Sequence, residues 1–183
     1  MRTLAVTQNI TLDGRIDMLG DWFDSQADDP ALRSESARQM AAADSLLVGR
    51  GTFESFRGHW HDLEGDTTGV SAYLDRVDKY VVSSTLDDPG WAGTTVLGGD
   101  WLDRVAALRD EEGGDIVCTG SVTLVHALFE ADLVDEVRLF QYPVVQGEGR
   151  GLFPDGWSTR ALELAETQVY GTGGGYQRWV VTR

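Results

Sequence analysis

The stretch of this chain that most clearly suggests chemistry covers residues 46–53, where an apolar run ends at Gly49 and is followed by Arg50 and Thr52. This order predicts a buried strand that opens directly into a helix. The first N–H groups of a helix lack intrahelical partners and lie at the positive end of its dipole, so such a junction can bind an anion. Arg50 and Thr52 could add hydrogen bonds to a phosphate. A tight turn with a capping threonine explains the same residues equally well.

A second junction of the same kind covers residues 116–124, where an apolar run ends at Gly120 and Ser121 precedes a helical pattern. Two such junctions in one sheet could hold two phosphates of an extended ligand such as a dinucleotide. Ser83 and Ser84 follow another apolar run, at the kind of strand end where open α/β sheets bind ligands. The alternative is structural, because every α/β domain contains several strand-to-helix turns and solvated loops.

Other catalytic and metal-binding patterns are absent from the sequence. Residues 147–151 contain three glycines but lack the G-x-G-x-x-G spacing, so they do not predict a Rossmann site. His59 and His61 stand two residues apart without a third ligand nearby, and we expect a loop anchored by Trp60 rather than a metal site. No hydrolase-like order of nucleophile and base is present.

The composition limits the class of protein. The chain has 183 residues, of which 42% are hydrophobic and 25% charged, and its formal net charge is −15. These values are typical of one globular domain, so we interpret residues 1–183 as a single domain. The negative charge disfavours nucleic acid and anionic membranes as partners. No apolar run approaches the roughly 20 residues of a spanning helix, and the N-terminus turns polar too early for a signal peptide, which predicts a cytoplasmic protein.

Hydrophobic periodicity predicts the elements that position the junctions. Apolar runs separated by helical patterns predict strands at residues 3–8, 45–48, 79–83, 94–97 and 115–118. Asp29 and Pro30 are a suitable cap and first residue for the first helix, and Ser121 is a natural cap for the last. Three extended runs then follow in succession, at residues 136–145, 162–170 and 176–182. Because successive strands cannot all be parallel neighbours, we expect a mostly parallel mixed sheet with helices on both faces.

Exposed aromatic and apolar residues suggest two further contacts. Trp22 and Phe23 lie in an acidic loop and could cover a flat ring of a ligand, or simply pack. Trp179, Val180 and Val181 belong to an apolar C-terminal strand that could pair or pack in a homodimer.

Four segments keep a recognisable order along the chain: residues 11–16 (TLDGRI), 46–54 (LLVGRGTFE), 79–86 (KYVVSSTL), and a last segment that starts at 120–125 (GSVTLV), continues through 133–139 (LVDEVRL) and ends at 142–153 (YPVVQGEGRGLF). Together they resemble the dihydrofolate-reductase-like superfamily, and more closely the branch related to the reductase domain of the bifunctional riboflavin-biosynthesis deaminase/reductase. The resemblance covers nearly the whole chain. It implies a central eight-stranded mixed sheet and NADPH as the cofactor.

The resemblance also implies roles for individual residues. The first junction would grip phosphates of the cofactor, the second would cradle the pyrophosphate, the serines after the third strand would lie near the adenosine 2′-phosphate, and the loop after the first strand would border the nicotinamide. The implied cofactor residues are Asn9, Ile16, Gly49, Arg50, Thr52, Ser83, Ser84, Gly120, Ser121, Thr123 and Leu124. Trp22 and Phe53 are assigned to the substrate side.

One position departs from the dihydrofolate reductases. Those enzymes carry an acidic residue on the first long helix that faces the pterin, whereas the nearest register here places Arg33 or Ser34 at that point, with Glu35 beside it. This departure argues against folate reduction. A proton for the reduced substrate would come from solvent, from Glu35 or from Asp13.

The sequence thus predicts an NADPH-dependent reductase that transfers hydride to a small heterocyclic substrate, pterin-, pyrimidinone- or flavin-like, with no metal. Arg50 favours NADPH over NADH, because a guanidinium pairs bidentately with phosphate. The alternative is a domain that keeps the fold and binds a nucleotide without catalysis, and the missing acid motivates it.

Overall fold

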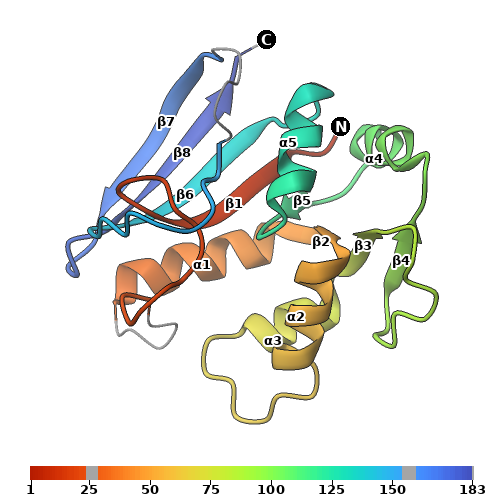
Figure 1. The fold of residues 1–183 in the computed structure, drawn as a ribbon, viewed down its shortest axis with the longest axis horizontal. Helices are drawn as coiled ribbons and strands as arrows, with labels where there is room; N and C mark the ends of the chain where they lie inside the picture. Colours follow the sequence, from red (N-terminus) through yellow and green to blue (C-terminus); the bar gives the residue numbers. More distant parts are fainter. Residues whose placement is uncertain (24–28, 154–159, 183) are drawn as a thin grey trace.

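The structure is a computed structural model that describes residues 1–23, 29–153 and 160–182 (Figure 1). Strands and helices alternate through most of the chain, and three strands follow the last helix. In chain order the elements are β1 (Leu4–Thr11), α1 (Pro30–Ala42), β2 (Ala43–Gly49), α2 (Arg50–Trp60), α3 (Val70–Arg76), β3 (Asp78–Val82), β4 (Thr94–Leu97), α4 (Trp101–Asp110), β5 (Asp115–Cys118), α5 (Val122–Glu130), β6 (Glu136–Tyr142), β7 (Leu162–Val169) and β8 (Gly175–Val181).

All eight strands form one mixed sheet in the order β4-β3-β2-β5-β1-β6-β8-β7. The six strands from β4 to β6 run parallel to their neighbours. Strand β8 is antiparallel to both β6 and β7. The predicted α/β fold, a mostly parallel eight-stranded sheet with an antiparallel finish, is therefore confirmed.

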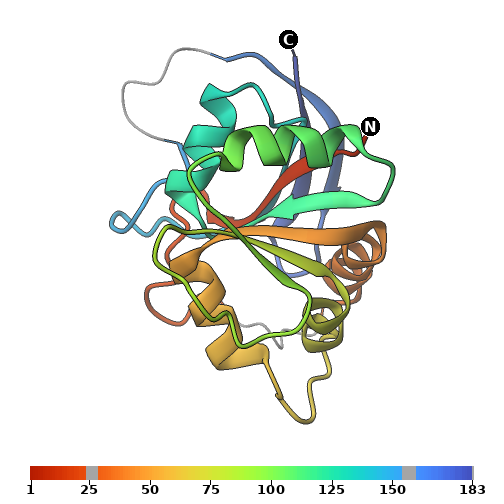
Figure 2. The ribbon, with the colours of Figure 1, turned by 90° about the vertical axis from the view of Figure 1, so that its right-hand side faces the viewer.

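Helices cover both faces of this sheet, as predicted. Figure 2 shows α4 and α5 on one face and α1, α2 and α3 on the other. Leu108 of α4 and Leu128 of α5 belong to the larger apolar core. Phe53 of α2 and Leu74 of α3 belong to a second core on the opposite face. No helix among residues 1–23, 29–153 and 160–182 is both long and apolar enough to cross a membrane.

Helix α1 begins where the sequence predicts. The Asp29 carboxylate accepts hydrogen bonds from the N–H groups of Ala31 (3.0 Å) and Leu32 (3.2 Å), and Pro30 occupies the first turn. The hydrogen bond from Leu32 is the largest cause that lowers the pKa of Asp29, so this cap stays ionised. Asp29 also accepts a bond from the N–H of Thr172, which joins the start of α1 to the β7–β8 turn.

Several element ends differ from the prediction for local reasons. Strand β3 ends one residue early, because the Ser83 hydroxyl accepts hydrogen bonds from the N–H groups of Thr85 and Leu86 and turns the chain. Strand β6 ends at Tyr142, because Pro143 has no N–H for the ladder. The loop expected around Trp60 begins later than predicted, because Trp60 is the last residue of α2 and His61 follows the helix.

The one lysine of the chain, Lys79 on β3, is completely buried. Its ammonium donates to the carbonyls of Leu74 (2.7 Å) and Val77 (2.9 Å) and lies 5.0 Å from the centre of the Trp91 ring. Burial lowers the pKa of Lys79. The residue therefore acts as a polar tie between α3 and β3 inside the second core.

Candidate functional site

The topology itself creates a crevice at the carboxyl ends of β2 and β5. These strands are neighbours in the sheet, with Leu47 paired to Cys118. The helices that follow them, α2 and α5, lie on opposite faces (Figure 2). Neighbouring strands whose following helices diverge form a switch point, which is where open α/β sheets bind ligands. A cavity of about 1080 Å³ opens at this point.

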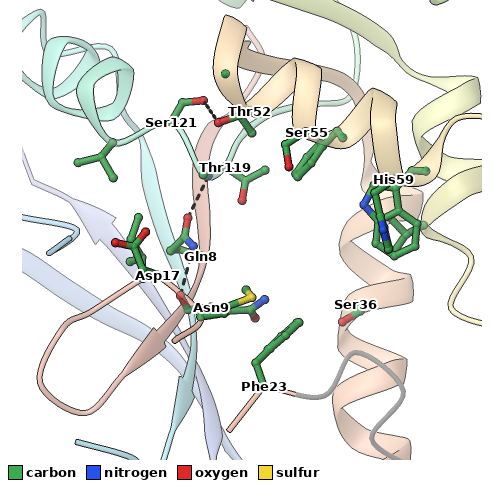
Figure 3. A pocket seen from close by; sticks show the side chains of 18 of the residues that line it. Gln8, Asn9, Asp17, Phe23, Ser36, Thr52, Ser55, His59, Thr119 and Ser121 are labelled. Atoms are coloured by element: carbon green, nitrogen blue, oxygen red, sulfur yellow. Dashed lines mark hydrogen bonds between the residues drawn. The ribbon is translucent and has the colours of Figure 1, made fainter. Parts of the chain in front are cut away.

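A buried serine joins the two strand-to-helix junctions. The Ser121 hydroxyl donates a hydrogen bond to the Thr52 hydroxyl (2.8 Å) (Figure 3). It also accepts one from the N–H of Gly49 (2.9 Å). We call these two hydrogen bonds the junction bridge. Nearby, the N–H of Gly120 donates to the side-chain oxygen of Gln8 on β1 (3.0 Å). Three parallel strands are thus tied together at the mouth of the crevice.

Gly120 is required at its position for two reasons. Its φ of +67° lies in the left-handed region that favours glycine. A Cβ there would also stand 3.0 Å from Cγ2 and 3.3 Å from Oγ1 of Thr52. The backbone of the second junction therefore packs directly against the first turn of α2.

The helix ends at the crevice are left open to a ligand. Within the described chain, no side chain caps α2 or α5 by a hydrogen bond, and neither first turn carries an acidic residue. Ser121 is the N-cap residue of α5, as predicted, but its side chain makes no capping hydrogen bond, because its hydroxyl is committed to the junction bridge. In α1, by contrast, Asp29 satisfies the first N–H groups. The unsatisfied N–H groups of α2 and α5 therefore suit an anion.

Most of the predicted cofactor residues line this one cavity. They come from both junctions, from β1 and from the loop that follows β1. The lining ones are Asn9, Ile16, Gly49, Thr52, Gly120, Ser121, Thr123 and Leu124. The structure therefore brings together segments that are far apart in the sequence, while Arg50, Ser83 and Ser84 lie outside the lining.

Those three residues gather beside the cavity, at the ends of β2 and β3. Arg50 donates to the hydroxyl of Thr85 (2.8 Å), and its Nε lies 3.6 Å from a carboxylate oxygen of Glu54. Half of the Arg50 side chain is exposed. Ser83 is partly buried and Ser84 is exposed. A cation and three hydroxyl residues thus form a separate polar patch next to the first junction.

The two residues predicted for the substrate side lie elsewhere. Phe53 is 1% exposed, packs against Trp91 with ring centres 6.0 Å apart, and does not line the cavity. Trp22 lies outside the lining; its indole N–H donates to Gln146 (2.7 Å), and its ring contacts Phe23 and Tyr142. Phe23 and Tyr142 do line the cavity, and Figure 3 shows the Phe23 ring pointing into it.

Glu35 is buried on α1, away from the cavity lining. Its carboxylate accepts two hydrogen bonds from Arg38 (2.7 and 2.8 Å) and one from Gln39 (2.8 Å). Leu32, Arg33, Ser36 and Met40 are the residues of α1 that line the cavity. The Glu35 carboxylate is therefore held by neighbouring side chains of α1 and does not reach the cavity.

Asp13 joins two loops instead of facing the cavity. It accepts hydrogen bonds from the Thr11 hydroxyl (2.6 Å) and from the N–H groups of Gln146 (3.0 Å) and Gly147 (2.8 Å). The bond from Thr11 is the largest cause that holds the pKa of Asp13 well below its usual range. An acid that stays ionised has no proton to give near neutral pH, so the predicted donor role does not fit.

The lining is poor in acids although the chain is rich in them. Of the 30 acidic residues in the sequence, Asp17 is the one that lines the cavity among those the structure describes. The Asp17 carboxylate accepts hydrogen bonds from the side-chain Nε of Arg150 (2.8 Å) and from the backbone N–H of the same residue (2.7 Å). The hydrogen bond with the Arg150 side chain is the largest cause that lowers the pKa of Asp17. An anion in the cavity therefore meets less electrostatic repulsion than it meets over the rest of this negatively charged chain.

Several lining residues are not predicted from the sequence. They include Gln8, Ser36, Met40, Ser55, His59 and Thr119. On α1 a signal exists: Leu32, Ser36 and Met40 repeat every four residues and thus share one face. His59 and Trp60 reach the cavity because α2 extends to Trp60, so the far wall depends on a helix end that the sequence pattern does not predict.

Comparison with known proteins gives one family and several relatives. The family model described as the RibD C-terminal domain matches residues 2–175. Uncharacterized protein YyaP of Bacillus subtilis (strain 168) is 27% identical over 175 residues, which are 94% of this chain and 91% of that protein.

Solved structures share the fold at low sequence identity. A putative riboflavin biosynthesis protein from Shewanella sp. PV-4 matches with a TM-score of 0.78 and 19% identity, covering 99% of both chains. A dihydrofolate reductase from Enterococcus faecalis, in complex with NADP(H) and RAB-propyl, matches with a TM-score of 0.65 and 19% identity. That match covers 99% of this chain and 97% of the reductase.

Proposed function

Because this chain belongs to the RibD C-terminal domain family, we propose that it is an NADPH-dependent reductase that transfers hydride to a small pterin-, pyrimidinone- or flavin-like heterocycle. The family and the shared fold support a reductase-type function, in agreement with the resemblance found in the sequence motifs. The cofactor and the substrate class are our proposal. One observation carries it: two uncapped helix N-termini open into a single cavity and are tied together by Ser121.

The residues of the cavity fit a dinucleotide with linked phosphates. Backbone N–H groups at two neighbouring helix starts can each receive a phosphate. Gly120 leaves the backbone uncovered at the second start, where a Cβ would stand only 3.0 Å from the Thr52 side chain. Acidic side chains are absent from both first turns in the described part of the chain. A volume of about 1080 Å³ gives room for a cofactor and a small substrate together.

Each part of the cofactor has a set of residues that would hold it. The linked phosphates would lie against Gly49, Thr52, Gly120, Ser121, Thr123 and Leu124. The adenosine 2′-phosphate would meet Arg50, Ser83 and Ser84, and the nicotinamide would border Asn9 and Ile16. Arg50 has the charge and the exposure that a 2′-phosphate partner needs.

When bound, NADPH supplies the hydride, and the chain supplies orientation and a water-poor wall. Asn9 from β1, Phe23 from the following loop and Ser36 from α1 surround one end of the cavity in Figure 3. The Phe23 ring can stack on a flat heterocycle, while the Asn9 amide and the Ser36 hydroxyl can hydrogen-bond its edge. Since Glu35 is turned away and Asp13 is ionised, we expect the proton to come from solvent.

A second candidate function is nucleotide binding without catalysis. It is favoured by the side chains that α1 presents to the cavity, namely Leu32, Arg33, Ser36 and Met40, none of which is acidic. A protein of this kind would bind NADPH at the two junctions and turn over no substrate.

Fluorescence of the tryptophans tests the proposal. Trp60 lines the cavity and should report on ligand binding. We expect NADPH to quench the emission with a micromolar Kd and NADH to bind more weakly. NADPH oxidation is then followed with a panel of pterins, pyrimidinones and flavins. No response to either nucleotide would refute the cofactor assignment, and binding without any turnover would favour the non-catalytic alternative.

A further inference from the structure

The junction bridge holds two helix ends that are remote in sequence. Ser121 precedes α5, whereas Gly49 and Thr52 mark the start of α2, about 70 positions earlier. We propose that Ser121 is a positioning residue that sets the separation between the two helix N-termini, so that the site selects ligands with two linked phosphates over ligands with one. This inference rests on the proposed function.

The separation is constrained from both sides. The two hydrogen bonds of the Ser121 hydroxyl, at 2.9 and 2.8 Å, draw the junctions together. Packing prevents a closer approach, because Gly120 already lies so near Thr52 that even a Cβ would touch it at 3.0 Å. Attraction at one residue and steric contact at the next leave the helix ends little freedom to slide.

The surroundings of Ser121 strengthen the junction bridge. Ser121 is 9% exposed, so little water competes for its hydroxyl. The neighbouring N–H of Gly120 is bonded to Gln8, which is 6% exposed and whose amide nitrogen donates to the carbonyl of Asn9 (3.2 Å). The second junction is therefore held on one side by α2 and on the other by β1.

A fixed separation matters only to a ligand that uses both helix ends at once. Linked phosphates have a short, nearly constant spacing, and a site already set to that spacing binds them without an ordering cost. A ligand that brings one phosphate to the junctions needs only one helix N-terminus, so the distance to the other N-terminus does not affect its binding. Loss of the bridge should therefore weaken the first kind of ligand much more than the second.

The test compares NADPH with its two halves. Reduced nicotinamide mononucleotide and 2′,5′-ADP each bring a single phosphate to the junctions. In Ser121→Ala we expect the Kd of NADPH to rise about tenfold, as loss of two buried hydrogen bonds allows, and the Kd of each half to change less than about twofold. All three ligands are titrated by tryptophan fluorescence with the full chain.

Ser45→Ala is the matched control. Ser45 is 1% exposed on the same strand that leads to the first junction, and its hydroxyl also makes two hydrogen bonds, with Arg2 and Asp44 at the opposite end. This variant loses a buried hydroxyl without touching the bridge, so the ratio of NADPH to half-ligand affinity should stay as in wild type.

Equal weakening of NADPH and of both halves in Ser121→Ala would overturn the positioning role, as would no change in any of them. Failure of the wild-type protein to bind NADPH would instead refute the proposed function. Thr52→Val provides a second variant of similar shape that removes one half of the bridge. Combined with Ser121→Ala it should lower NADPH affinity by clearly less than the product of the two single effects, whereas full additivity would exclude action of Ser121 through Thr52.

Discussion

The two ends of the cavity are built in different ways. The junction end consists of backbone at the starts of α2 and α5, together with short side chains that bond to each other across neighbouring strands. The other end, which we call the wall end, consists of side chains from α1, the far end of α2 and the loop after β1. Backbone geometry at a switch point tolerates little change, whereas wall side chains can change without moving the sheet. The comparison implies that the proposed cofactor binding and the proposed substrate choice can vary separately.

The largest expected effect comes from Gly120→Ala, which attacks the junction end directly. The added Cβ would meet Thr52 at 3.0 Å, at a backbone φ of +67°. We expect NADPH affinity to fall about 100-fold and stability to fall by about 1–3 kcal/mol, measured by titration and thermal melting. Gly51→Ala is the control for stability, because its Cβ would meet nothing within 4 Å, and it should melt at or above the wild-type temperature. Wild-type affinity in Gly120→Ala would contradict the assignment.

Arg50→Ala should have the next largest effect and should concern one phosphate only. Loss of a charge-assisted contact predicts a roughly tenfold weaker Kd for NADPH and an unchanged Kd for NADH, which lacks the 2′-phosphate. Arg104→Ala removes the same charge from an exposed position on α4 and should alter neither value. A similar loss for both nucleotides would mean that Arg50 acts on the shared phosphates instead.

Asp13→Asn tests the loops beside the wall end through their pH dependence. The folded-state pKa of Asp13 lies below its unfolded value, so its ionised form stabilises the fold above the unfolded pKa, and this contribution fades as the pH falls toward the folded pKa. Near pH 7 we expect the variant to melt a few degrees below wild type. Below about pH 4 the difference should shrink. The exposed Asp110→Asn serves as the control in the same melting series; a gap for Asp13→Asn that does not depend on pH would contradict this reading.

The smallest effect on cofactor binding is expected from the wall itself. Ser36→Ala removes a hydroxyl from the cavity face of α1 without adding bulk. The Kd of NADPH should stay within about twofold of wild type, because α1 does not contribute to either junction, while KM for a substrate found in the panel should rise several-fold. A large loss of NADPH affinity would show that the two ends are coupled.

The same contrast explains what the sequence could predict. Gly49, Gly120 and the hydroxyl residues beside them are local signals, since a strand end, a glycine and a helix start follow one another within a few residues. The cap of α1 at Asp29 and Pro30 is equally local. The sheet and its helices on both faces followed from such signals together with the family resemblance.

The wall end could not be predicted in the same way, because it depends on how each helix is turned. Phe53 follows Thr52 directly, yet one residue is a rotation of 100° on a helix, so Phe53 enters the core while Thr52 lines the cavity. Glu35 and Ser36 differ for the same reason. The junction bridge itself joins residues about 70 positions apart, and only the pairing of β2 with β5 brings them together.

The burial of Lys79 has a practical consequence for the experiments above. Lys79 is the one lysine of the sequence and is 0% exposed, so the folded chain offers no lysine ammonium to reagents in solution. An amine-reactive dye should therefore modify Lys79 only when the structure opens. Labelling of Lys79, followed by mass spectrometry, can then report whether a variant such as Gly120→Ala is folded under the conditions of the titrations.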